Sequence, residues 1–278
     1  MPELPEVETT RRGIEPWLVD HTISGWTVRN SALRWPVQIP NELRGETVLS
    51  VHRRAKYLLL GTHAGTLIVH LGMSGSLRIL DPGTPVLKHD HVDINFDNGK
   101  VLRLNDPRRF GCVLFQAGDD PSQHALLAKL GVEPLGNEFS GRYLHGLSRN
   151  RKVAVKNFIM DSKIVVGVGN IYAAEALFLA GIRPATRAGR LPLHKFDDLA
   201  TAIKAVLARA VSKGGTTLRD FVGSDGKPGY FRQQLNVYGR QNEACRRCSA
   251  RLKGQTLGQR STVYCPNCQS SQGFGASK

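Results

Sequence analysis

Acidic residues are scarce in this sequence. Asp and Glu number 23 against 38 Lys and Arg, which gives a formal net charge of +15 at pH 7. An excess of this size favours a polyanionic partner, with nucleic acid ahead of an anionic membrane surface. Hydrophobic residues make up 41% of the 278 residues and aromatic residues 7%, which is ordinary for a globular protein with room for two domains.

The sequence also lacks a secretory signal and an uninterrupted apolar stretch. Its first residues are acidic and contain no apolar segment of the signal-peptide type. The one long apolar run, Ile164–Ile182, contains Gly167, Gly169, Asn170 and Glu175. A carboxylate near the middle of such a run argues against a membrane span. We therefore expect a cytoplasmic protein.

Cysteine is rare as well, and four of the five cysteines form two CxxC pairs. Cys245 and Cys248 make the first pair, and Cys265 and Cys268 make the second after sixteen intervening residues. Two such pairs place four soft thiolates in tetrahedral reach of one ion and leave no position for water. They predict one structural zinc ion rather than disulfides, which fits a reducing compartment. Cys112 is expected to be a buried thiol.

The first residues, Met1-Pro2-Glu3-Leu4-Pro5-Glu6-Val7-Glu8, carry a possible nucleophile. Removal of Met1 would free the secondary amine of Pro2, and an α-amino group has a pKa of about 7.7–8.0 against about 10.4 for lysine. Such an amine attacks an aldehydic carbon to give an iminium ion, and Glu3 stands beside it as a possible proton donor. Pro5 suits the first turn of a helix with Glu6 and Glu8 at its positive end. The alternative is an ordinary second residue before a helix.

After this helix, the sequence to about residue 116 predicts an antiparallel β-sandwich. Short β-rich segments alternate with Gly or polar turns, and Asn98-Gly99 makes a hairpin turn. The predicted strands are Thr47–Val51, Tyr57–Leu60, Thr66–His70, Ser76–Leu80, Val92–Phe96, Val101–Leu104 and Val113–Phe115.

Beyond a short helix predicted around Ser122–Leu130 and a linker at Glu133–Ser140, the pattern becomes helical. Helices are predicted near Val153–Met160 and Ile171–Ala180. Leu199, Ile203, Val206, Leu207 and Val211 mark the apolar face of another helix, which Gly214-Gly215 ends. Polar residues with several glycines predict a long loop from Thr216 to Phe231.

Three Gly-rich turns offer chemistry but each also has a plain structural explanation. The turn before Asn170 leads into a helix, where backbone amides grip phosphates, with Asn170 as the cap. The turns His70–Gly75 and Asn105–Gly111 carry Met73 and Phe110, which suit a wedge in a base stack or a place in the core. Lys56 either binds phosphate or is solvated, and the basic zinc segment after Glu243 either binds DNA or is a solvated face.

Taken together, these segments resemble formamidopyrimidine-DNA glycosylase, a bacterial enzyme family that removes 8-oxoguanine and ring-opened purines from DNA. The resemblance covers nearly the whole chain, through PELPEVET, RRAKYLL, HLGMSGSLRIL, KHDHVD, DPRRFG, VVGVGNIYA, GGTTLRDF, SDGKPGYF and the cysteines. It implies an α+β fold: an N-terminal antiparallel β-sandwich with an N-terminal helix (1–132), a helix–two-turn–helix domain (141–238) and a C-terminal zinc finger (239–272). DNA would lie in the cleft between the domains.

The resemblance also implies a role for each motif. Pro2 matches the Schiff-base nucleophile, Glu3 the neighbouring acid, Lys56 the proton donor for β-elimination and Arg260 the finger arginine of δ-elimination. Met73, Arg108 and Phe110 match the trio that enters the gap left by a flipped nucleotide, and Thr216–Tyr230 matches the loop over the extruded base. The DNA-binding positions implied in addition are His70, His89, Arg109, Arg151, Lys156 and Asn170.

We therefore expect a monomeric, bifunctional DNA glycosylase and abasic-site lyase of the bacterial cytoplasm and nucleoid. Its partner is double-stranded DNA with oxidised purines opposite cytosine, and its one cofactor is the structural Zn²⁺. Two alternatives are an endonuclease VIII-like glycosylase for oxidised pyrimidines and a non-catalytic zinc protein that binds damaged DNA. The first usually opens with PEGPE and lacks the MSG and RRF pairing, and the second does not require Pro2 and Glu3.

Overall fold

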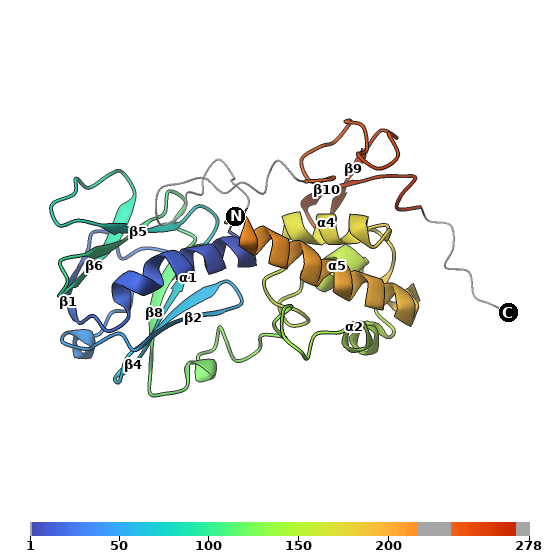
Figure 1. Cartoon of the computed structure of the whole chain (residues 1–278). Helices are drawn as coiled ribbons and strands as arrows, with labels where there is room; N and C mark the ends of the chain where they lie inside the picture. Colours follow the sequence, from blue (N-terminus) through green and yellow to red (C-terminus); the bar gives the residue numbers. More distant parts are fainter. Residues whose placement is uncertain (1, 216–234, 271–278) are drawn as a thin grey trace. The chain divides into compact units, whose positions relative to one another are not determined.

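The computed structural model describes residues 2–215 and 235–270 of the chain (Figure 1). Within these residues the chain divides into two compact units, one of residues 2–129 with 211–215 and the other of residues 130–210 with 235–270. The first is built from β-sheets and one long helix, and the second is mostly helical with a small hairpin near its end. The predicted α+β fold class is confirmed.

The first unit holds two antiparallel sheets, each of four strands among the described residues. One sheet has the order β1-β6-β7-β5 and the other the order β2-β3-β4-β8. The Asn98-Gly99 turn joins β6 to β7 as predicted, with Gly99 in the left-handed region at a φ of 74°. The elements are α1 (Leu4–Leu18), β1 (Ile23–Val28), η1 (Asn41–Leu43), β2 (Ser50–Arg54), β3 (Tyr57–Gly61), β4 (Gly65–His70), β5 (Ser76–Leu80), β6 (Asp90–Phe96), β7 (Val101–Asn105), β8 (Cys112–Ala117) and η2 (Pro121–Gln123).

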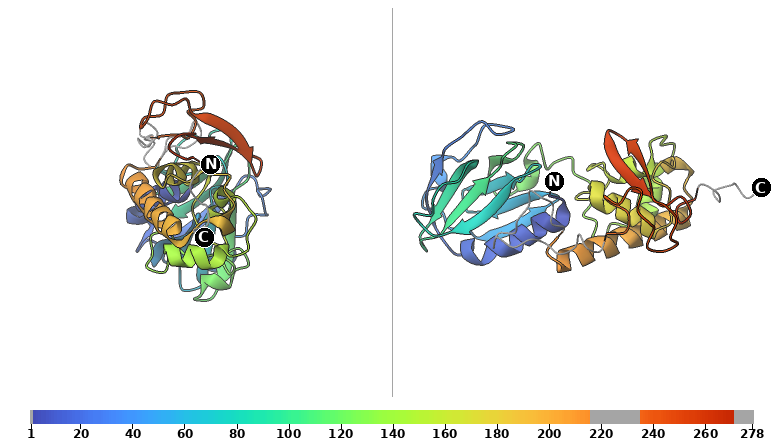
Figure 2. Two further views of the ribbon diagram at one scale, coloured as in Figure 1. Left: turned by 90° about the vertical axis from the view of Figure 1, so that its right-hand side faces the viewer. Right: turned by 90° about the horizontal axis from the view of Figure 1, so that it is seen from above.

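The core of this unit lies between the sheets and under α1, which runs alongside the strands in Figure 2. The strands contribute alternate residues to this core, such as Leu58 and Leu60 of β3, as the two-residue period of a strand requires. Val7, Ile14 and Leu18 supply the buried stripe of α1 and are all at most 1% exposed. The helix packs against β2, β3 and β5, and so against both sheets.

Two predictions of local structure in this unit are wrong. The strand predicted at Thr47–Val51 begins later, at Ser50, because Thr47 pairs with Thr22 and the Val48 N–H donates to His21 O at 3.0 Å. The helix predicted at Ser122–Leu130 is only the 3-10 turn η2. His124 has an extended backbone with a ψ of 133°, and its Nδ1 accepts the Leu126 N–H that would otherwise bond along the chain.

The second unit contains a set of packed helices and a β-hairpin near its end. In α5 the predicted face is confirmed, since Leu199, Ile203, Val206 and Leu207 are buried. Gly214 and Gly215 follow this helix with φ angles of 71° and 80°, which stop it as expected. The elements are α2 (Gly141–Ser148), α3 (Val155–Ile159), α4 (Asn170–Leu179), η3 (Ala188–Arg190), α5 (Leu193–Ser212, of which the last two residues belong to the first unit), β9 (Lys253–Leu257) and β10 (Arg260–Tyr264).

Among the helices of the described residues, none combines the length and the apolar character that crossing a membrane demands.

Candidate functional site

Pro2 and Glu3 lie at the buried start of α1. Glu3 is the N-cap, and its carboxylate accepts the backbone N–H of Glu6, while Glu6 Oε2 accepts the Glu3 N–H at 2.9 Å. Glu3 is 1% exposed and Glu6 is fully buried. This reciprocal capping fixes the backbone on which Pro2 stands. The sequence indicates Glu6 only as a charge at the helix end, because a capping box usually begins with Ser, Thr, Asp or Asn rather than Glu.

Lys56 sits in the tight turn between β2 and β3. Ala55 before it adopts a φ of 55°, and Arg53 Nη1 donates to Ala55 O at 2.8 Å. Arg53 Nε also pairs with Glu8 Oε2 at 3.1 Å, so the turn is tied to α1. Burial by itself raises the pKa of the Glu8 carboxyl, but the guanidinium groups of Arg12, Arg11 and Arg53 outweigh it and hold the pKa below its usual value.

His70 ends β4 and is held in one tautomer. Its Nδ1 accepts the Gly72 N–H at 3.0 Å, and its ring lies 4.8 Å from the ring of Tyr57. Burial of the ring, with smaller contributions from the charges of Lys56 and Arg34, lowers the pKa of His70 to about 4. The imidazole is therefore neutral at pH 7, and its proton is on Nε2 because Nδ1 accepts a hydrogen bond.

Met73 and the Arg108–Phe110 segment lie on two turns that touch. Phe110 is 42% exposed, and the Arg108 guanidinium carbon lies 5.0 Å from the centre of its ring. Met73 is half-buried. Phe110 is thus not the core residue that one explanation of its motif required.

His89 stands on a loop that buried charges hold in place. It has a φ of 74°, and Asp106 N donates to its carbonyl at 3.0 Å. Asp90, which follows it, is 4% exposed and accepts from Leu87 N at 2.8 Å and from Asn105 Nδ2 at 2.8 Å.

Beneath this loop, Arg103 donates to both oxygens of Asp93 at 2.7 and 2.8 Å and also to the carbonyls of Thr84 and Pro85. Burial raises the pKa of Asp93, but its hydrogen bonds with Arg29 and Arg103 lower it below the usual value. The paired charges satisfy the loop carbonyls and so restrain the backbone that carries His89.

In the second unit, Lys156 and Asn170 meet the hairpin that carries Arg260. Lys156 is fully buried, and its Nζ donates to Asn170 Oδ1 at 2.6 Å, Thr262 Oγ1 at 2.5 Å and Ser261 O at 3.3 Å. Asn170 Nδ2 also donates to Ser261 O, at 3.1 Å. The prediction that Asn170 caps its helix is wrong, because the N-cap is Gly169 and no side chain caps the helix there. Arg151 and Arg260 are exposed.

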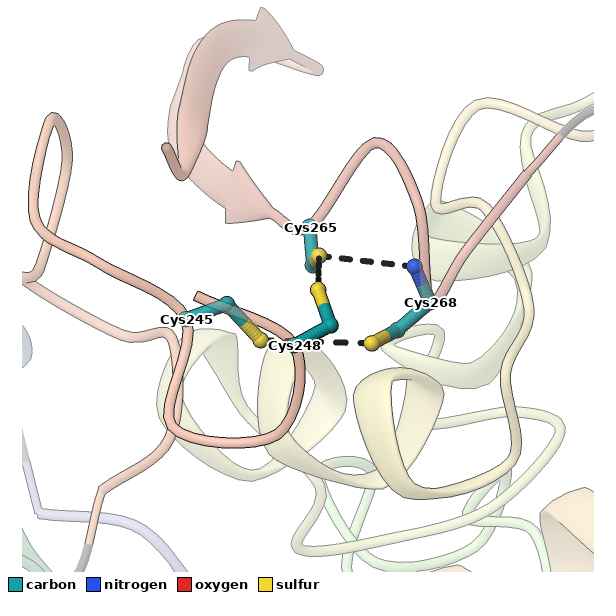
Figure 3. A group of neighbouring side chains, drawn as sticks. All are labelled: Cys245, Cys248, Cys265 and Cys268. Atoms are coloured by element: carbon teal, nitrogen blue, oxygen red, sulfur yellow. Dashed lines mark hydrogen bonds between the residues drawn. The ribbon is translucent and has the colours of Figure 1, made fainter. Parts of the chain in front are cut away.

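The four paired cysteines converge on one point, as Figure 3 shows. Cys248 Sγ lies 3.4 Å from Cys265 Sγ, Cys245 Sγ lies 3.9 Å from Cys268 Sγ, and all four sulfurs are within 4.8 Å of one another. Four thiolates at about 2.3 Å from a tetrahedral zinc are spaced by about 3.8 Å, so the geometry fits one ion. The predicted zinc site is confirmed. Cys112 is a separate buried thiol, and burial raises its pKa to about 11.

The candidate residues share a backbone feature that the sequence does not reveal. Eight non-glycine residues in the described part of the chain have positive φ. Five of them are, or directly precede, a candidate DNA-binding or catalytic residue. Left-handed backbone at non-glycine residues tends to persist where function maintains it. These five are Ala55 before Lys56, His89, Arg109, Asn150 before Arg151 and Gln259 before Arg260. The predicted loop Thr216–Tyr230 lies outside the described residues.

The depressed pKa of His70 predicts acid sensitivity. An unfolded histidine titrates near 6.5, so between pH 6.5 and about 4 the unfolded chain binds a proton that the folded ring does not. This linkage removes up to about 3 kcal/mol of stability as the pH falls through that window. We expect urea unfolding of His70→Asn to lose less stability between pH 7.5 and 4.5 than the parent does. The exposed His63→Asn control should behave as the parent, and equal losses in all three would contradict the assignment.

The zinc site predicts one metal ion per chain and a dependence of the finger's fold on it. Cys248→Ser changes an exposed ligand, so it should remove the zinc and lower the melting temperature without disturbing the core. Metal analysis and thermal melting measure the two effects. Cys112→Ala, which changes the unrelated buried thiol, should keep its zinc. Folded Cys248→Ser that retains a full equivalent of zinc would refute the site.

Comparison with known proteins places three consecutive family models on this chain. They are described as the formamidopyrimidine-DNA glycosylase N-terminal domain at residues 1–113, the H2TH domain of the same family at 130–222, and a zinc finger found in FPG and IleRS at 242–270. Among curated relatives, the formamidopyrimidine-DNA glycosylases of Magnetococcus marinus and Alcanivorax borkumensis are 59% and 58% identical. Each alignment covers 97% of this chain and at least 99% of the relative.

Solved structures of the same family also match this chain. A Lactococcus lactis FPG mutant in complex with a Fapy-dG containing DNA matches with a TM-score of 0.90 and 32% identity, over 97% of this chain and 100% of that one. MutM (FPG) from Thermus thermophilus matches with a TM-score of 0.87 and 33% identity, over 98% and 100% of the two chains. From three matched domains, full-length relatives and the shared fold, we conclude that this chain belongs to the formamidopyrimidine-DNA glycosylase family.

Proposed function

We propose that this chain is a bifunctional base-excision repair enzyme. It removes oxidised purines, 8-oxoguanine and formamidopyrimidines, from duplex DNA and then cleaves the abasic site by β,δ-elimination. The observation that carries the proposal is the position of Pro2, next to the buried Glu3 at the capped start of α1. Relatives solved with Fapy-dG containing DNA, abasic-site DNA and carbocyclic 8-oxo-G containing DNA support the substrate class.

In the first step the nitrogen lone pair of Pro2 forms a bond to C1′ of the damaged nucleotide. The glycosidic bond breaks, and the base leaves with the electron pair and takes up a proton. The Pro2 nitrogen then loses its proton, the sugar ring opens as this nitrogen forms an iminium bond to C1′, and Glu3 supplies the proton that O4′ gains. The intermediate is a covalent electron sink on the enzyme.

The iminium ion acidifies the proton on C2′. Loss of this proton expels the 3′ phosphate with the C3′–O electron pair, assisted by proton donation from Lys56. A second elimination, to which Arg260 is assigned, releases the 5′ phosphate. Water then hydrolyses the iminium and frees Pro2, which leaves a one-nucleotide gap with phosphates at both ends. The steps need no redox partner, and zinc serves to fold the finger.

The remaining residues hold DNA in this proposal. Met73, Arg108 and Phe110 fill the gap left by the extruded nucleotide. The protein acts as a monomer in the cytoplasm and nucleoid, with residues 1–132, 141–238 and 239–272 as its catalytic, helical and zinc-finger parts. Because the ammonium of Lys156 is buried, this residue serves DNA binding through the Arg260 hairpin. The phosphate-backbone contacts are assigned to His70, His89, Arg109, Arg151 and Asn170.

The nucleophile is tested by borohydride trapping on a duplex with 8-oxoguanine opposite cytosine. Pro2→Gly keeps an amine at the chain start but not the secondary amine, so we expect DNA binding to persist while the trapped adduct falls sharply. The exposed Pro82→Gly control should trap like the parent. An adduct mapped to Lys56 would contradict the role of Pro2, whereas undiminished trapping at the chain start of Pro2→Gly would mean that a primary amine serves equally well. Absence of any adduct in the parent would favour a non-catalytic DNA-binding protein.

The base opposite the lesion is read, we expect, by Arg108. Its guanidinium has five donors and no acceptor, which suits O2 and N3 of cytosine and leaves the amine of adenine unpaired. A polar match of this kind is worth roughly 1–3 kcal/mol, or about ten- to a hundredfold in rate. Single-turnover excision should therefore favour cytosine over adenine in the parent and lose this preference in Arg108→Ala.

Arg109→Ala provides the matched control for this measurement. Arg109 is assigned to the phosphate backbone, so its loss should slow excision from both duplexes to a similar extent and keep their ratio. A parent without preference, or an Arg108→Ala variant that keeps it, would show that another group reads the opposite base.

A further inference from the structure

Two turns far apart in the sequence are in direct backbone contact in the first unit. A Cβ atom added to Gly72 would come within 2.4 Å of the Phe110 carbonyl carbon and 2.5 Å of Gly111 N. A Cβ added to Gly111 would come within 2.6 Å of His70 O. Both glycines are required by this close approach, and Gly72 also has a φ of 63°. The turn of Met73 and the turn of Arg108 and Phe110 therefore form one body.

A fully buried carboxylate, Asp106, connects the two turns. Its Oδ2 accepts the Gly111 N–H at 2.8 Å, which closes the Arg108–Phe110 turn from its far end. Its Oδ1 accepts the hydroxyl of Ser74 at 2.8 Å, across to the Met73 turn. Ser74 is 4% exposed and Asp106 is 0% exposed, so solvent does not compete for these bonds.

The same hydroxyl group holds the backbone of Arg108. Ser74 Oγ accepts the Arg108 N–H at 3.2 Å while it donates to Asp106. The hydroxyl hydrogen is thereby committed to the carboxylate, and its lone pair faces the arginine amide. A single oxygen thus sets the distance between the residue after Met73 and the residue that starts the Arg-Arg-Phe segment.

The main chain of Asp106 is fixed on its other side as well. Its carbonyl accepts from Arg109 N at 3.2 Å and lies 2.9 Å from Nε2 of the buried His91. Its N–H donates to His89 O at 3.0 Å. Asp106 therefore has little freedom to follow any movement of the turn, and both carboxylate oxygens keep their directions.

The side chains that these bonds support are not themselves held by the protein core. Arg108 and Phe110 are exposed, and the contact of the Arg108 guanidinium with the Phe110 ring at 5.0 Å lies at the surface. A long arginine on a movable backbone would reach several positions, because its own rotamers are many. Selection between two bases by this group requires the backbone under it to be fixed.

We propose that Ser74 and Asp106 are positioning residues that set the direction of Arg108 and so determine discrimination at the base opposite the lesion. This inference rests on the proposed function, in which Arg108 faces that base. Neither residue touches DNA in this arrangement, and both act through the backbone of the Arg108–Phe110 turn. Their removal changes selectivity rather than the chemistry at Pro2.

The test compares Ser74→Ala and Asp106→Asn with the parent on two duplexes, 8-oxoguanine opposite cytosine and opposite adenine. Ser74→Ala removes one hydroxyl and keeps the turn's shape, so it serves if Asp106→Asn folds poorly. The ratio of single-turnover rates on the two duplexes should fall roughly three- to tenfold, the effect of one lost hydrogen bond. Ser122→Ala and Asp120→Asn are matched controls, because Asp120 Oδ1 accepts the Ser122 N–H at 2.9 Å on an exposed turn elsewhere.

A second measurement separates this inference from the function on which it rests. A single-stranded oligonucleotide with a preformed abasic site has no opposite base, so borohydride trapping on it reports only the nucleophile. We expect parent, Ser74→Ala and the controls to trap equally. Trapping by the parent together with an unchanged cytosine preference in Ser74→Ala would overturn the positioning role and leave the function standing. Failure of the parent to trap would instead overturn the function.

Discussion

The burial of the first turn of α1 is the constraint on which the rest of the structure depends. Leu4, Glu6 and Val7 are at most 1% exposed, so the N–H groups at the start of this helix have no access to water. The capping between Glu3 and Glu6 satisfies the N–H groups of these two residues internally, and Pro5 has none. Because α1 packs on strands of both sheets, the position of the chain start is set by the β-sandwich core rather than by a flexible end.

Much of the fold can be predicted from short sequence patterns, each within one helix, strand or turn. Alternation of apolar residues and Gly-containing turns predicted the strands β3 to β8, and the apolar face and glycine stop predicted α5. Failures occurred where a side chain or a distant segment took over a backbone group. The Nδ1 atom of His124 accepts the Leu126 N–H that a helix would use. The Val48 N–H donates to His21 O, so Val48 does not join the predicted strand. β9, with the sequence Lys-Gly-Gln-Thr-Leu, has no apolar alternation by which it could be predicted.

The functional site likewise has a part that the sequence predicts and a part that it does not. The cysteine spacing determines the metal geometry because four thiolates around one ion leave few alternatives. The contacts that orient the other residues join partners far apart in sequence, such as Ser74 with Asp106 and Lys156 with Thr262. Resemblance to a family supplied the identities of these candidates. It could not supply their hydrogen-bond partners or the left-handed backbone at Ala55, His89 and Arg109, which only the assembled structure reveals.

The buried side chain of Lys156 connects the start of α4 to the hairpin that precedes the second cysteine pair. It joins Asn170, the first residue of α4, to Ser261 and Thr262 of β10, and Cys265 follows that strand directly. A ligand that orders the start of α4 and a metal that orders the cysteine pairs therefore act on the same short hairpin. Reciprocity then requires that whatever free energy one contributes to the other's binding is returned in equal amount. On the proposed role of Asn170 in DNA binding, zinc and DNA would be linked through this hairpin.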